Sequence, residues 1–205
     1  MSAAATTVAE IEIPIAERGP SPRKVIVGYG FWLFLLSDII VFSALFAAYA
    51  VLAGRTAQGP SGVQLFHRDN VLIETGCLLF SSFTCAMMSL SIELRKKGWM
   101  VIAAALTFVL GAAFLRLELV EFAAMVARGA GPDRSAFLSA FFALVGMHGL
   151  HVTLGLCWLV AMMAQVFTLG WRPMVLDRLA CFSLFWHALD IVWIGVFTIV
   201  YLGAR

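Results

Sequence analysis

The chain has 205 residues and a formal net charge of +2, and 62% of its residues are hydrophobic. Only 13% are charged, about half the share of roughly 25% that is usual in soluble domains. This composition excludes a water-soluble globular protein, a disordered chain and a small disulfide-rich secreted domain. The small charge, with no basic stripe, also argues against nucleic-acid binding. An integral membrane protein remains.

The first 27 residues form a polar segment of mixed charge that contains Pro20 and Pro22. They include no short apolar core followed by a cleavage site of small residues, which a secretory signal peptide would need. We therefore expect residues 1–27 to be a polar cytoplasmic tail. The remaining residues, 28–205, are expected to form one transmembrane domain.

Five apolar segments follow the tail, and each is at least as long as the roughly 20 residues that a helix needs to cross the hydrocarbon core. Each must be helical in lipid, because an open strand would leave its backbone polar groups unpaired. The sequence thus predicts an all-α membrane protein, a bundle of five transmembrane helices. The predicted spans are approximately 28–53, 70–92, 98–127, 136–169 and 177–203.

The distribution of Lys and Arg predicts the orientation of the bundle. The tail and the connections on its side of the membrane carry eight of these residues, against five on the other side. Because cytoplasmic segments carry the excess of positive charge, we expect a cytoplasmic N-terminus and a periplasmic C-terminus. The eight are Arg18, Arg23, Lys24, Arg95, Lys96, Lys97, Arg172 and Arg178, and the five are Arg55, Arg68, Arg128, Arg134 and Arg205.

Nine ionisable residues lie inside the predicted spans and away from their ends, where each is costly and is a candidate for function. Counted from the centre of each span, one group falls near the midplane and could form a buried polar network. A second group falls in the outer half and could form another polar cluster. The first group is Asp38, His148, His151, His187 and Asp190, and the second is Glu74, Arg116, Glu118 and Glu121.

Three pairs of these residues stand three positions apart, which places both members on one helix face. They are Glu118 with Glu121, His148 with His151, and His187 with Asp190. Such pairs resemble the ligand sets of two-metal sites in helical bundles, but no helix carries the Glu-x-x-His motif of those sites. A hydrogen-bonded network that fixes helix register and a proton relay are the other two interpretations. We favour the network and expect neither a metal ligand nor a catalytic residue.

Four segments carry a resemblance to a known family. They are GFWLFLLSDIIVFSALFAAYAVL (30–52), TAQGPSG (56–62), GPDRSAFLSAFFALVGMHGLHVTLGL (131–156) and SLFWHALDIVWIGVFTIVYL (183–202). From about residue 28 onward the chain resembles subunit III of the haem-copper respiratory oxidases. The five-helix subunit III of bo-type ubiquinol oxidases is most similar, because of the GPDRS motif and because related cytochrome c oxidase chains commonly have two further N-terminal helices.

The resemblance implies a non-catalytic subunit of a proton-pumping ubiquinol oxidase in the aerobic respiratory chain, located in the bacterial inner membrane. In this family the haems and copper belong to subunit I, which reduces oxygen to water, and subunit II and a small subunit IV complete the complex. The chain itself would bind no cofactor except phospholipid, and would support assembly, lipid binding and proton uptake.

Individual residues match the motifs of this family. His148 and His151 correspond to the histidines of HGLHV, His187 and Asp190 to the pair in WHxxD, and Glu118 and Glu121 to carboxylates on the same helix. Asp38 falls where many relatives have a membrane-buried glutamate that reacts with a hydrophobic carbodiimide, and it is one methylene shorter. Two alternatives stay open, namely subunit III of a cytochrome c oxidase and a free-standing intramembrane metalloenzyme.

Overall fold

The structure is a computed structural model that describes residues 23–57 and 68–203, and in these ranges the chain is a pack of long helices without strands. The helices are α1 (Arg23–Leu52), α3 (Arg68–Glu93), α4 (Lys97–Ala127), α5 (Ala136–Leu169) and α6 (Pro173–Val196). A π-helix, η2 (Phe197–Leu202), continues α6 without a break. Five of these helices are long and apolar enough to cross a membrane, so the predicted five-helix architecture is confirmed.

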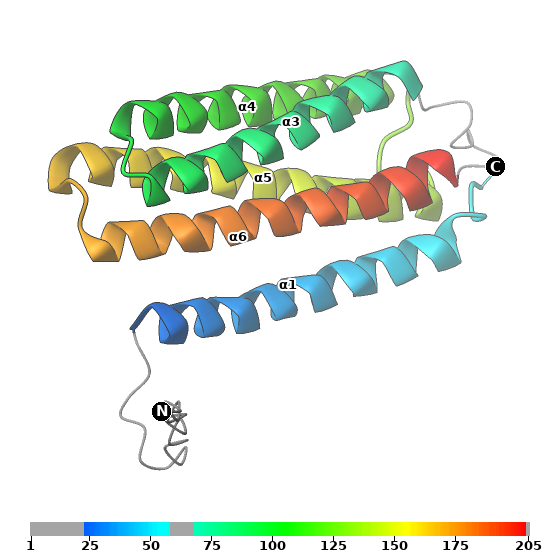
Figure 1. Ribbon diagram of the computed structural model, residues 1–205. Coiled ribbons are helices and arrows are strands. Elements are labelled where there is room, and N and C mark those ends of the chain that lie inside the picture. Colours follow the sequence, from blue (N-terminus) through cyan, green and yellow to red (C-terminus); the bar gives the residue numbers. More distant parts are fainter. Residues whose placement is uncertain (1–22, 58–67, 204–205) are drawn as a thin grey trace, which may run out of the picture.

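Helices α3, α4, α5 and α6 form a four-helix bundle in which each helix contacts two neighbours. Successive helices run in opposite directions, and Figure 1 shows α3 and α4 on one side with α5 and α6 beside them. Short connections between antiparallel neighbours are typical of such bundles. The turns after α3 and after α5 therefore lie at the same end as the start of α1 (Figure 1).

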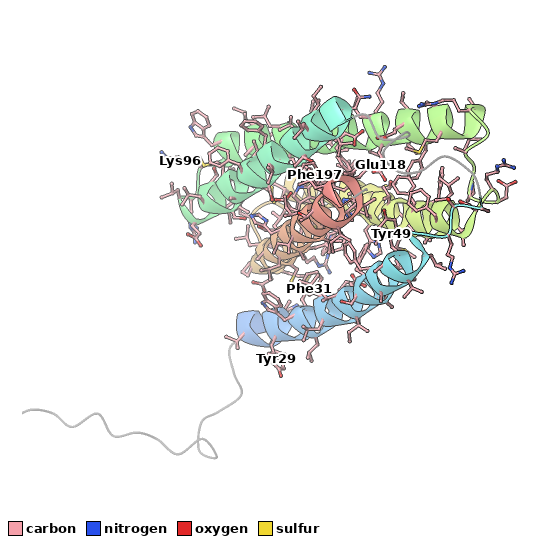
Figure 2. The ribbon with its side chains drawn as sticks, turned by 90° about the vertical axis from the view of Figure 1, so that its right-hand side faces the viewer. Tyr29, Phe31, Tyr49, Lys96, Glu118 and Phe197 are labelled. Carbon is pink, nitrogen blue, oxygen red and sulfur yellow. The ribbon has the colours of Figure 1, made fainter. Side chains whose placement is uncertain are left out.

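Helix α1 lies along one side of this bundle, where it contacts α5 and α6 (Figure 1). Only 11% of its apolar window is buried, compared with 33–44% in the other four helices. Figure 2 shows Phe31 on the side of α1 that faces the bundle and Tyr29 pointing away from it. Helix α1 is therefore the least enclosed of the five.

The ends of the helices follow local sequence signals. Ser135 caps α5, where its hydroxyl accepts a hydrogen bond from the backbone N–H of Leu138 at 3.2 Å. Gly170 ends α5 with a φ of 71°, a conformation that glycine adopts without strain. Pro173 then begins α6 at a position where proline is favoured.

Two helices start earlier than the sequence predicted. Helix α6 starts before residue 177, the expected start, because hydropathy detects only where the apolar run begins. Helix α1 likewise starts at Arg23, within the expected tail.

Two tryptophans of α6 tie this helix to α3. The indole N–H of Trp186 donates to the Ser81 hydroxyl at 3.1 Å, and that of Trp193 donates to the Thr75 hydroxyl at 3.1 Å. Both rings are almost fully buried. Buried Tyr and Trp side chains usually need such a partner for their polar atom. These two contacts set the position of α6 against α3 at two levels of the bundle.

Candidate functional site

Three carboxylates from two helices meet inside the bundle. Glu74 of α3 and Glu118 and Glu121 of α4 are 1%, 3% and 9% exposed. They lie close enough for mutual electrostatic interaction, and Tyr201 of η2 interacts with all three. Figure 2 shows Glu118 between α4 and the helices below it. The predicted outer cluster thus brings together its three acidic members, which we call the acid cluster.

The acid cluster is only partly satisfied by the described residues. Both carboxylate oxygens of Glu74, Oε2 of Glu118 and Oε1 of Glu121 have no hydrogen-bond partner among them. Arg128, at the end of α4, interacts electrostatically with Glu121. Buried polar groups without a protein partner commonly bond to water. Chemically, this arrangement suits the binding of water and the sharing of protons between carboxyl groups.

Arg116 does not join the acid cluster, although it occurs only two residues before Glu118. Its side chain is exposed on the outer surface of α4. Two residues along a helix correspond to a rotation of about 200°, so a helix that turns Glu118 inward turns Arg116 outward. Arg116 is therefore placed outside the predicted group, and the three acids are not neutralised by it.

Asp38 of α1 and His151 of α5 approach each other at the interface of these two helices. The distance from His151 Nε2 to Asp38 Oδ2 is 3.9 Å, and both side chains are partly exposed. The Nδ1 atom of His151 lies 2.8 Å from the Met147 carbonyl oxygen. Because a carbonyl can only accept, Nδ1 carries a hydrogen, and Nε2 is left to face Asp38. The 3.9 Å distance is too long for a direct hydrogen bond and suits a bridging water.

His148 occupies an apolar cage rather than a polar network. Its side chain is fully buried, and neither ring nitrogen has a hydrogen-bond partner among the described residues. Three aromatic rings surround it, with centroid distances of 5.1 Å to Trp193, 5.7 Å to Phe114 and 6.4 Å to Phe42. The cage draws one ring from each of α1, α4 and α6, so His148 sits where these helices meet α5.

Asp190 faces α3, whereas His187 lines a groove between α6 and α1 together with Ile39 and Phe42. The Nδ1 atom of His187 lies 2.8 Å from the Ser183 carbonyl oxygen and therefore carries a hydrogen. Asp190 interacts electrostatically with His187 and lies beside Ser82 of α3. The five residues predicted near the midplane thus form no single hydrogen-bonded network among the described residues. Asp38 pairs with His151, Phe42 contacts the rings of both His151 and the caged His148, and Asp190 pairs with His187.

Sequence reasoning missed a row of hydroxyl groups along α3. The Thr84 and Thr107 hydroxyls bond each other at 2.8 Å across α3 and α4, and Ser89 donates to the Ser183 hydroxyl at 3.0 Å across α3 and α6. Ser and Thr are nearly neutral in hydropathy, so a search for ionisable residues passes over them. The stretch SSFTCAMMSLS (81–91) was the available signal, since hydroxyls join helices in membranes.

A metal-binding interpretation is not supported by the placement of these side chains. His151 and His187 each have one carboxylate near them, His148 is enclosed by aromatic rings, and the acid cluster contains no histidine. Among residues 23–57 and 68–203, no three His, Cys, Asp or Glu side chains are placed to hold a metal ion.

Comparison with protein families identifies the chain. Residues 20–204 match the family described as cytochrome c oxidase subunit III. This match covers all five helices and every residue of the two predicted groups.

The chain belongs to the cytochrome c oxidase subunit III family.

Within this subunit III family, the chain is similar to curated proteins named as quinol oxidase subunits. It is 52% identical over 174 residues to the cytochrome bo(3) ubiquinol oxidase subunit 3 of Pseudomonas aeruginosa, covering 85% of this chain and 83% of that one. It is 44% identical to the protein of the same name from Buchnera aphidicola subsp. Baizongia pistaciae (84% and 89% covered). The quinol oxidase subunit 3 of Bacillus subtilis is 43% identical (84% and 85% covered). With five spanning helices, this subunit III family member is a multi-pass membrane protein.

Proposed function

We propose that the chain is the subunit III of a proton-pumping terminal ubiquinol oxidase in the bacterial inner membrane. The observation that carries this proposal is the likeness to relatives named quinol or ubiquinol oxidase subunit 3, at 43–52% identity over more than four-fifths of both chains. Quinol oxidation and oxygen reduction take place in the complex, and the catalytic work is done by another subunit.

The partners in this proposal are a haem- and copper-bearing subunit I, subunit II and a small subunit IV. This chain supports the assembly of the complex, binds lipid and supports proton uptake. Its N-terminus lies in the cytoplasm and its C-terminus in the periplasm. The placement of its polar residues supports a non-redox role, because the histidines bond backbone carbonyls or pack in an aromatic cage. No residue of this chain is proposed to be catalytic, and Asp38 and His151 are proposed to hold α1 against α5.

Affinity purification of the tagged chain from its native membrane in mild detergent tests this proposal. The expected result is co-elution with a large membrane subunit and haem bands in the reduced-minus-oxidised optical spectrum. The chain alone, freed by harsher detergent, is expected to contain no stoichiometric metal. A colourless chain that elutes alone from an otherwise intact, haem-containing membrane extract would contradict the proposal.

A second candidate is subunit III of a cytochrome c oxidase, which the description of the matching family favours. The two differ in the electron donor of the complex. Oxygen consumption by the purified complex with ubiquinol as donor, unaffected by added cytochrome c, supports the first candidate. Oxygen consumption that requires reduced cytochrome c supports the second.

A further inference from the structure

Arg116 lies deep within the part of α4 that crosses the membrane. It is four residues beyond the middle of a 31-residue helix, which corresponds to about 6 Å from the centre at 1.5 Å per residue. With a hydrocarbon core about 30 Å thick, the Cα atom of Arg116 lies about 9 Å inside the nearer boundary when α4 is centred. A charged side chain at this depth is rare and usually has a partner.

No described residue of the chain provides that partner. Arg116 is exposed on the outer surface of α4, and within the described ranges it makes no hydrogen bond or ion pair. Two other arginines do have partners: Arg128 donates to the Ala124 carbonyl oxygen at 3.1 Å, and Arg178 donates to the Gln165 side-chain oxygen at 2.9 Å. The acids of α4 cannot reach it, because Glu118 and Glu121 point into the bundle.

The direction of α4 also works against extension of Arg116 to the lipid headgroups. The nearer membrane surface lies toward the C-terminal end of α4, whereas side chains on a helix lean toward its N-terminus. The Cα–Cβ bond of Arg116 therefore leans toward the bilayer centre. Long basic side chains near helix ends often reach the interface, but this one starts out in the opposite direction. Arg116 is therefore better satisfied by a partner group at its own depth in the membrane than by the lipid headgroups.

The surface around Arg116 permits close approach of another helix. Residues three, four or seven positions away share its face. They include the small residues Ala112, Ala113 and Ala123, the exposed Val109 and Val120, and one larger exposed residue, Leu119. Small residues allow helix backbones to come together in membranes, where packing and polar contacts drive association. We call Val109, Ala112, Ala113, Arg116, Val120 and Ala123 the Arg116 face.

We propose that the Arg116 face docks against a membrane-spanning helix of another oxidase subunit, which presents a carboxylate side chain to the guanidinium. An arginine and a carboxylate can form two parallel hydrogen bonds. These bonds neutralise both charges and determine the relative orientation of the two groups. The inference rests on the proposed function, because it requires a partner subunit. The Arg116 face lies on the side of the bundle away from the polar interior. The inference makes this face the contact surface between the chain and the partner subunit.

The test uses the intact complex, purified in mild detergent through a tag on another of its subunits, and measures the amount of this chain per haem. Arg116→Leu is expected to lower the retained chain at least tenfold, because it leaves the partner carboxylate buried and uncompensated. Arg116→Lys should retain an intermediate amount. Arg134→Leu, the same change at an exposed position between α4 and α5, should leave retention unchanged. Equal or greater retention of the Arg116→Leu chain would overturn the inference.

A second experiment does not depend on a variant that weakens assembly. A photo-reactive amino acid in place of Val120, which is 59% exposed on the Arg116 face, is expected to cross-link to another oxidase subunit within two helical turns of an Asp or Glu. Cross-links to lipid alone would contradict the proposal. A third outcome is that the unchanged chain purifies with the haem-bearing complex while Arg116→Leu is retained normally and position 120 cross-links to no subunit. In that case this inference fails while the proposed function stands.

Discussion

At the scale of single residues, His151 and Asp190 each face a polar group of another helix. His151 lies 3.9 Å from Asp38, and Asp190 lies beside Ser82. Replacement of either by Ala is expected to lower the stability of the assembled complex by about 1–3 kcal/mol, because it removes the polar contact that each makes with a neighbouring helix. Thermal unfolding of the purified complex measures this loss. Ser37→Ala is the control, since the Ser37 hydroxyl is exposed and bonds only within its own helix.

Unchanged melting temperatures for both His151→Ala and Asp190→Ala would show that these two contacts do not hold helices together. A loss in only one of them would assign the stabilising contact to that interface, α1 with α5 or α6 with α3.

Asp38 allows a separate prediction about activity. Asp38→Asn keeps the size of the side chain and removes its charge. We expect the oxygen-reduction rate of the assembled complex to stay within about twofold of the original, a change of less than about 0.5 kcal/mol in activation free energy, because the redox centres belong to another subunit in the proposed function. Oxygen-electrode assays on complexes with equal haem content measure this rate. An inactive complex with normal assembly would show that Asp38 takes a direct part in turnover.

Sequence spacing predicted which residues share a helix face but not which helices would meet. The three acids do come together, because Glu118 and Glu121 stand one turn apart and α3 packs against α4. The midplane group does not join into one hydrogen-bonded network within the described part of the chain, since depth alone does not determine the direction of a side chain around its helix. The aromatic cage of His148 depends on rings from α1, α4 and α6, a combination that only the fold supplies.

At the scale of helices, the indole of Trp186 fixes the spacing of α4, α5 and α6. A Cβ atom at Gly111 of α4 would lie 2.9 Å from this ring, and one at Gly155 of α5 would also lie 2.9 Å from it. The ring is further held by its hydrogen bond to Ser81 of α3. One side chain therefore contacts the other three helices of the bundle, and two glycines make room for it.

Gly111→Ala is therefore expected to destabilise the protein by about 1–3 kcal/mol, the usual cost of overpacking a tight core. Gly146→Ala is the matched control, because the nearest atom to its new Cβ is 3.7 Å away in Phe122, an ordinary contact. In a helix this control change is neutral or slightly favourable. Thermal stability of the two variants, compared in the same detergent, gives the answer. Equal stability would mean that the Trp186 ring can move aside.

The helices themselves were predictable because their length and composition leave no alternative in lipid. The ends of the helices were harder to predict. Hydropathy marks where apolar residues begin, whereas α6 begins at Pro173, where the chain geometry allows a helix to start. The contacts of Trp186 and Trp193 with α3 could not be derived from the sequence, because they depend on which of several Ser and Thr residues the packing brings opposite each indole.

At the scale of the whole molecule, the five helices form a four-helix bundle with a lightly buried fifth helix beside it (Figure 1). Much of the outer surface is apolar, as expected for a chain surrounded by lipid and by other membrane subunits. A subunit that is stabilised by its partner should lose stability when the partner is removed. The isolated chain is therefore expected to unfold at a lower temperature than the same chain within the complex.

The central claim, that this family member serves a ubiquinol oxidase, is tested most directly by the electron donor of the complex that carries it. The measurement is the oxygen-consumption rate of the affinity-purified complex with ubiquinol and, separately, with reduced cytochrome c. We predict rapid oxygen consumption with ubiquinol and none above background with cytochrome c. Turnover with cytochrome c alone, or a purified chain without any haem-bearing partner, would contradict the claim.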